Sequence, residues 1–87
     1  MAQDFTLKVF SMAMCPDCVH AKNLLDAEGV VYEEIDIHKD PDAGALLEEK
    51  TGKRGVPYFL INDEEWWRAY TPREPFNPAL IKNKLGL

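Results

Sequence analysis

The residues best suited to chemistry are Cys15 and Cys18, which stand in the stretch Cys15-Pro16-Asp17-Cys18 and are the only cysteines of the chain. Two thiols with this spacing can form and break a disulfide reversibly when the first lies at the start of a helix. Unpaired N–H groups and the helix dipole at such a position favour the thiolate. Cys15 is therefore the candidate nucleophile, and Cys18, one turn further on, is the candidate resolving thiol.

The two residues between the cysteines have opposite expected effects. Pro16 suits the first turn of a helix, where its missing N–H removes no hydrogen bond. Asp17 places a carboxylate beside Cys15, which should raise the pKa of that thiol and so oppose the helix dipole. We expect the exposed Asp17 to have the weaker influence of the two.

Two other interpretations of the cysteine pair stay open at this point, a buried structural pair and half of a metal site. A structural zinc site usually needs four ligands. The chain has only two histidines, His20 and His38, and His20 falls on a different helical face from Cys18. We therefore expect both histidines to be surface residues and no metal site within one chain, whereas a site shared by two chains stays open.

The elements that must position the pair follow from periodicity and punctuation. The pattern predicts four strands and three helices, with a turn at Asn62-Asp63 and helix starts at Asp40-Pro41 and Asn77-Pro78. The strands are expected at residues 5–10, 30–37, 57–61 and 66–70. The helices are expected over the run 19–28 with Pro16 in the first turn, from Pro41 to Gly52, and from Pro78 through Leu85.

This order implies an α/β fold. A strand, helix and strand in succession predict a parallel pair joined by a right-handed crossover, and the hairpin adds two antiparallel strands. Helices on both faces would cover a four-stranded mixed sheet. The chain has 87 residues, which is enough for one domain, so residues 1–87 are expected to form a single unit.

The composition excludes several classes of function. The net charge of −5 opposes binding to nucleic-acid phosphates. No apolar run is long enough for a membrane span, and the first residues do not read as a signal peptide. A cytoplasmic location is therefore expected, where a closely spaced cysteine pair suggests catalysis or metal binding rather than a structural disulfide.

Together these residues resemble the glutaredoxin family of the thioredoxin superfamily. Four stretches carry the resemblance, in the family order and over about two thirds of the chain. They are Val9-Phe10-Ser11, the Cys15-Pro16-Asp17-Cys18 motif, Tyr32-Glu33-Glu34-Ile35-Asp36-Ile37, and Thr51-Gly52-Lys53-Arg54-Gly55-Val56-Pro57-Tyr58-Phe59.

The resemblance implies a thioredoxin-like fold and the activity of a dithiol–disulfide oxidoreductase. It implies that Pro57 is a cis-proline facing the active cysteine, and that the backbone of Val56 pairs with the bound thiol partner. It also implies a glutathione or substrate site that includes Met14, Arg54 and Thr71, in which Arg54 binds the glycyl carboxylate of glutathione. Glutathione is then the expected electron donor, disulfide-containing proteins are expected partners, and no cofactor is expected to be bound.

The chain departs from the common family pattern after the fourth strand. Most members carry two glycines and an acidic residue there, which hold the γ-glutamyl end of glutathione. Here the residues are Trp66-Trp67-Arg68-Ala69-Tyr70-Thr71-Pro72-Arg73-Glu74, in which Arg68, Thr71 or Arg73 are candidate replacements. A lysine that many members have shortly before the first cysteine is also absent from Ser11-Met12-Ala13-Met14.

The same segment is similar to that of glutaredoxin-like redoxins reduced by thioredoxin reductase, through Trp67, Tyr70 and Pro78. Thioredoxin reductase is therefore an alternative electron donor. Separately, the protein is expected to be a monomer. Two further functions stay open: an iron–sulfur carrier, against which Cys18 argues, and a partner-binding module that uses Trp66 and Trp67. Because adjacent strand residues face opposite ways, only one of these tryptophans needs to pack under a given helix.

Overall fold

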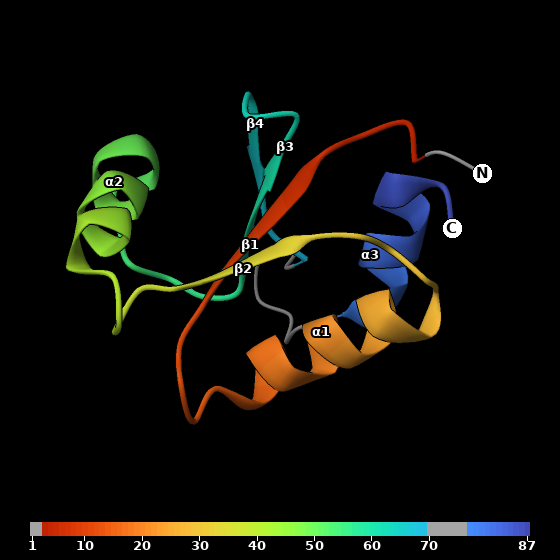
Figure 1. Ribbon diagram of the computed structural model, residues 1–87, viewed down its shortest axis with the longest axis horizontal. Helices are drawn as coiled ribbons and strands as arrows, with labels where there is room; N and C mark the ends of the chain where they lie inside the picture. The colour runs from red at the N-terminus through yellow and green to blue at the C-terminus, as the bar shows by residue number, and fades with distance from the viewer. Residues whose placement is uncertain (1–2, 70–76) are drawn as a thin grey trace.

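A computed structural model describes residues 3–69 and 77–87 of the chain (Figure 1). Within these residues the order of strands and helices is βαβαββα, as the sequence predicts. The elements are β1 (Leu7–Ser11), α1 (Pro16–Ala27), β2 (Glu33–Asp36), α2 (Pro41–Thr51), β3 (Tyr58–Ile61), β4 (Glu65–Trp67) and α3 (Pro78–Leu85). No helix in the described part of the chain is long and apolar enough to cross a membrane.

The four strands form one mixed sheet in the order β2-β1-β3-β4. Strand β1 is central, since it pairs in parallel with β2, placing Val9 opposite Glu34, and antiparallel with β3, placing Val9 opposite Phe59. Helices α1 and α3 cover one face of the sheet and α2 covers the other (Figure 1). The predicted four-stranded mixed sheet is confirmed.

Each helix begins where the sequence places a capping residue before a proline. Asp40 accepts a hydrogen bond from the N–H of Ala43 at 3.2 Å, and Asn77 accepts one from the N–H of Ala79 at 3.0 Å. These bonds satisfy N–H groups that have no partner inside the helix. Helix α2 ends at Gly52, whose φ of 83° is the left-handed conformation that a glycine adopts at little cost.

The β3–β4 hairpin turns at Asn62 and Asp63, as predicted. Both residues have positive φ, at 55° and 57°, which is the conformation of a type I′ turn. The Asn62 side chain also accepts a hydrogen bond from the N–H of Thr6 at 3.0 Å. The turn therefore fixes the register of the hairpin and ties it to the segment before β1.

Two apolar clusters hold the layers together, one on each face of the sheet. The cluster under α1 and α3 contains Leu7, Val9, Ala21, Leu25, Phe59, Ile61 and Ile81, and the cluster under α2 contains Phe10, Ile37, Leu47 and Leu60. Trp67 packs against the first cluster, with its ring 5.5 Å from that of Phe59, and Trp66 packs against the second, 5.1 Å from Phe10. The two tryptophans therefore face opposite sides of the sheet. Both are half-buried, and both contribute to packing.

All four strands are shorter than predicted, and the second and fourth fall shortest of the expected length. The second strand was expected over residues 30–37, but only Glu33–Asp36 pair with β1. It is an edge strand, so residues without a partner on β1 have no ladder to join, and Val31 is 75% exposed. The fourth strand ends at Trp67 rather than at residue 70, and Tyr70 lies outside the described residues.

Candidate active site

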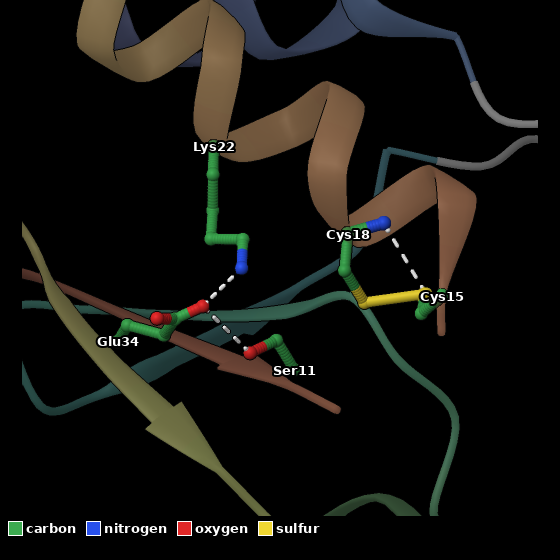
Figure 2. Close-up of a disulfide and its surroundings, with 5 residues drawn as sticks. All are labelled: Ser11, Cys15, Cys18, Lys22 and Glu34. Carbon is green, nitrogen blue, oxygen red and sulfur yellow. Dashed lines mark hydrogen bonds and ion pairs between the residues drawn. A yellow bond between two sulfur atoms is a disulfide. The ribbon is translucent and has the colours of Figure 1, made fainter. Parts of the chain in front are cut away.

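Cys15 and Cys18 are joined by a disulfide at the start of α1 (Figure 2). Their Cα atoms are 5.2 Å apart, within the usual range for a disulfide. Cys15 is the N-cap residue of α1, and its sulfur accepts a hydrogen bond from the N–H of Cys18 at 3.2 Å. The sulfur of Cys15 therefore lies where a helix N-terminus stabilises negative charge.

The two cysteines differ in exposure. Cys18 is fully buried on the inner face of α1, beside Ala21 and Leu25, whereas Cys15 is half-buried at the helix start. A reagent in solution can therefore reach Cys15 but not Cys18. The two sulfur atoms of the pair therefore differ in their access to solvent.

The loop before Cys15 presents apolar side chains to solvent. Met14 is 99% exposed and has a φ of 61°, in the left-handed region. Met12 and Val19 are also among the exposed large apolar residues of the described chain. Met14 thus presents an exposed apolar side chain directly before Cys15 in the chain.

Asp17 was expected to be exposed, but it is half-buried in the first turn of α1, next to both cysteines along the chain. We expect the Asp17→Asn variant to have a lower Cys15 thiol pKa than the unaltered protein, because it removes a negative charge beside the thiolate. Titration of the thiolate absorbance of the reduced proteins measures this pKa. An unchanged or higher pKa in the variant would contradict the expectation.

The Gly55-Val56-Pro57 stretch leads into β3. The peptide bond between Val56 and Pro57 is cis, and Pro57 is fully buried. Val56 is half-buried and packs against the apolar cluster under α2. The backbone of this loop is thus held by packing on its inner side.

Arg54 is already engaged by a carboxylate of its own chain. Its Nε donates a hydrogen bond to Glu48 of α2 at 2.8 Å, and both side chains are more than half exposed. The guanidinium also lies over Gly44, where an added Cβ would be 3.5 Å from it. An anionic ligand that binds Arg54 must therefore share the guanidinium with Glu48 or displace it.

Arg68 lies directly after β4 and reaches the loop before β3. Its guanidinium carbon is 5.4 Å from the centre of the Tyr58 ring, and a Cβ added to Gly55 would come within 3.2 Å of that carbon. Gly55 therefore allows a close approach that a larger residue would obstruct. Two other candidates from the same segment, Thr71 and Arg73, lie outside the described residues.

A polar network that the sequence did not single out lies beside the disulfide (Figure 2). The carboxylate of Glu34 on β2 forms an ion pair with Lys22 on α1 and accepts a hydrogen bond from the hydroxyl of Ser11 at 3.2 Å. Lys22 comes four residues after Cys18, so the two share a helical face. That spacing was the available signal for Lys22, whereas nothing in the sequence pairs it with Glu34.

Two titratable groups near β2 have shifted pKa values with structural causes. Hydrogen bonds from the backbone N–H groups of His38 and Lys39 lower the pKa of Asp36. Burial and a hydrogen bond to Asp26 raise the pKa of Tyr32 to about 12. Asp36 thus stays ionised and shapes the turn before α2.

The comparisons with known proteins agree with this geometry. The family model described as Glutaredoxin matches residues 7–66. Glutaredoxin 1 of Rickettsia typhi is 35% identical over 60 residues, covering 67% of this chain and 58% of that protein. The chain thus spans about three-fifths of the length of the curated Rickettsia relatives that it matches.

Solved structures show the same fold. The thioredoxin-like protein BC3987 is similar with a TM-score of 0.71 and 27% identity, over 90% of this chain and 97% of that one. The glutaredoxin-like protein NrdH-redoxin from Escherichia coli gives a TM-score of 0.70 at 20% identity, over 90% of this chain and 92% of that one, which speaks to the fold alone. From the matched residues, the cysteine pair and the fold, it follows that this chain belongs to the glutaredoxin family.

Proposed function

We propose that the chain is a dithiol–disulfide oxidoreductase with Cys15 as the nucleophile and Cys18 as the resolving thiol. The observation that carries the proposal is the placement of Cys15 at the N-cap of α1, with its sulfur 3.2 Å from the N–H of the buried Cys18. A substrate can reach the sulfur of Cys15, and the helix N-terminus stabilises its thiolate. The sulfur of Cys18 is held within bonding distance of it and protected from solvent.

The proposed reaction has two exchange steps, and its electrons balance within the dithiol. The Cys15 thiolate attacks a substrate disulfide, forms a mixed disulfide and releases the first substrate thiolate, which takes up a proton. Cys18 then loses its proton and attacks the sulfur of Cys15, releasing the second substrate thiolate. Two electrons pass from the protein to the substrate, and the Cys15–Cys18 disulfide remains.

Protein disulfides and glutathione mixed disulfides are the proposed substrates, and glutathione is the proposed donor that restores the dithiol. The exposed Met12, Met14 and Val19 next to the pair suit an apolar protein surface. The test compares turnover driven by glutathione and its reductase with turnover driven by thioredoxin reductase. Activity with neither donor, on either class of disulfide, would overturn the proposal.

The ion pair between Arg54 and Glu48 yields a prediction about glutathione. If Arg54 binds its glycyl carboxylate, Glu48→Gln should lower the KM for glutathione about two- to threefold, because an exposed ion pair is worth roughly 0–1 kcal/mol. Arg54→Ala should raise that KM. Steady-state kinetics with glutathione as the varied substrate measures both.

A matched control is available on the same helix, since Glu49 is exposed and appears in no ion pair of the described residues. Glu49→Gln removes the same charge and should leave the KM unchanged. Equal effects of the two glutamate variants would indicate a general influence of net charge. An unchanged KM in Arg54→Ala would remove Arg54 from the glutathione site.

A further inference from the structure

We infer that the Lys22–Glu34 ion pair sets how readily Cys18 becomes a thiolate, and that it thereby controls the rate of the second exchange step. The inference rests on the proposed dithiol function and goes beyond it by assigning a role to residues outside the cysteine motif. It explains how a thiol with no solvent contact can lose a proton at a useful rate.

The chemical need arises from burial. Cys18 is 0% exposed, and an apolar environment disfavours the charged form of a thiol. The helix N-terminus stabilises the thiolate of Cys15, whose sulfur accepts the hydrogen bond from the N–H of Cys18. That N–H group is then not available to the sulfur of Cys18. Cys18 therefore needs a charge of its own nearby to support its thiolate.

The charged side chains on the elements around Cys18 are few in the described part of the chain. Helix α1 carries Asp17, His20, Lys22 and Asp26, and β1 carries Lys8. Strand β2 carries Glu33, Glu34 and Asp36, Arg68 follows β4 and lies against Gly55, and β3 has no charged residue. Lys22 lies one helical turn after Cys18, and Figure 2 shows both side chains projecting from α1 toward the sheet. Lys22, one helical turn away on the same face of α1, is therefore the cation that we infer to favour the Cys18 thiolate.

Glu34 partly neutralises the Lys22 ammonium and orients the Lys22 side chain. Its carboxylate pairs with Lys22, whose side chain is 27% exposed, while its own side chain is 43% exposed. Ser11, only 2% exposed at the end of β1, donates its hydroxyl to the same carboxylate oxygen. The network thus joins α1, β1 and β2, and it places one positive and one negative charge on the side of α1 from which Cys18 projects (Figure 2).

A charge mechanism predicts effects of opposite sign for the two partners. Lys22→Gln leaves the Glu34 carboxylate unbalanced and should raise the pKa of Cys18, whereas Glu34→Gln leaves the Lys22 ammonium unbalanced and should lower it. Each unit of pKa changes the thiolate fraction about tenfold below the pKa, and the accompanying change in nucleophilicity offsets about half of this on a logarithmic scale. For a shift of about one unit in the pKa of Cys18, the second step should therefore slow about threefold in Lys22→Gln and accelerate about threefold in Glu34→Gln.

The second step can be observed directly with 5,5′-dithiobis(2-nitrobenzoate), a disulfide that releases a coloured thiolate. Attack by Cys15 releases the first thiolate in a phase that depends on reagent concentration. Attack by Cys18 on the mixed disulfide releases the second in a phase that does not. The rate of this second phase, followed as a function of pH in stopped flow, gives the apparent pKa of Cys18.

The matched control is the ion pair between Glu28 and Lys82 at the other end of α1, with an N–O distance of 3.2 Å. Glu28→Gln and Lys82→Gln should leave the second phase unchanged, and the double variant Lys22→Gln/Glu34→Gln should return close to the unaltered rate. Shifts of the same sign in Lys22→Gln and Glu34→Gln, or no shift in either, would overturn the inference in favour of a purely structural network.

A failure of the proposed function is distinguishable from a failure of this inference. If the unaltered protein shows no second phase and no turnover, the dithiol route itself is wrong. The Cys18 pKa in the reduced proteins, read from the pH dependence of its Cβ chemical shift, still tests the charge effect in that case. Unaltered turnover together with pKa shifts of the same sign in both single variants would refute the inference alone.

Discussion

The Cys15→Ser variant is expected to lose disulfide reductase turnover by about 10³-fold or more, because a serine hydroxyl is not ionised at neutral pH and is a poor nucleophile toward sulfur. The loss should reach the non-enzymatic rate with both glutathione mixed disulfides and protein disulfides. The assay couples turnover to the oxidation of the nicotinamide cofactor of the donor reductase. Retention of more than a tenth of the unaltered rate would show that another group attacks the substrate.

A suitable control keeps the site and changes its surroundings. Met14→Ala alters the exposed residue beside Cys15 but leaves both thiols in place. It should change the KM for a protein disulfide more than the turnover number, because Met14 is proposed to contact the substrate and not the reacting sulfur atoms. This pattern separates loss of chemistry from loss of binding.

The Phe59→Ala variant is expected to lose about 3–5 kcal/mol of unfolding free energy, the usual cost of truncating a buried aromatic side chain. Phe59 is 0% exposed, lies opposite Val9 in the sheet, and packs edge-on against Trp67 at 5.5 Å. Small domains are stabilised by only about 5–15 kcal/mol, so this loss would leave the fold marginal. Urea denaturation followed by tryptophan fluorescence measures it.

The conservative Phe59→Leu variant provides the comparison. It keeps most of the apolar volume and should cost less than about 1.5 kcal/mol. A loss below about 1 kcal/mol in Phe59→Ala would contradict the position of Phe59 at the centre of the cluster under α1 and α3. The result bears on function because the same cluster includes Ala21 and Leu25, which fix the helix that presents both cysteines.

The fold could be predicted from local signals because those signals act within a few residues of one another. Asp40 and Asn77 cap their helices as predicted, and Asn62-Asp63 forms the predicted turn. The ends of β2 could not be predicted in the same way. Strand length at a sheet edge depends on which residues of β1 remain available for pairing, and Val30 and Val31 have strand-like side chains without such a partner.

The candidate site was predictable to a similar extent. The spacing of Cys15 and Cys18 and the helix that follows were enough to place one sulfur at a helix N-terminus. The partners of charged residues were not predictable, because they depend on how separate elements pack. Arg54 meets Glu48 across the end of α2, and Lys22 meets Glu34 across the layer between helix and sheet.

The measurement that tests the central claim most directly is the mass of the adducts formed with oxidised glutathione by the Cys18→Ser and Cys15→Ser variants. If Cys15 attacks and Cys18 resolves, Cys18→Ser should accumulate one glutathione per chain, located on Cys15 by peptide mapping. Cys15→Ser should remain almost unmodified, because Cys18 is buried. Glutathione found on Cys18 of the Cys15→Ser variant at a comparable rate, with none on Cys15 of the other variant, would contradict the account.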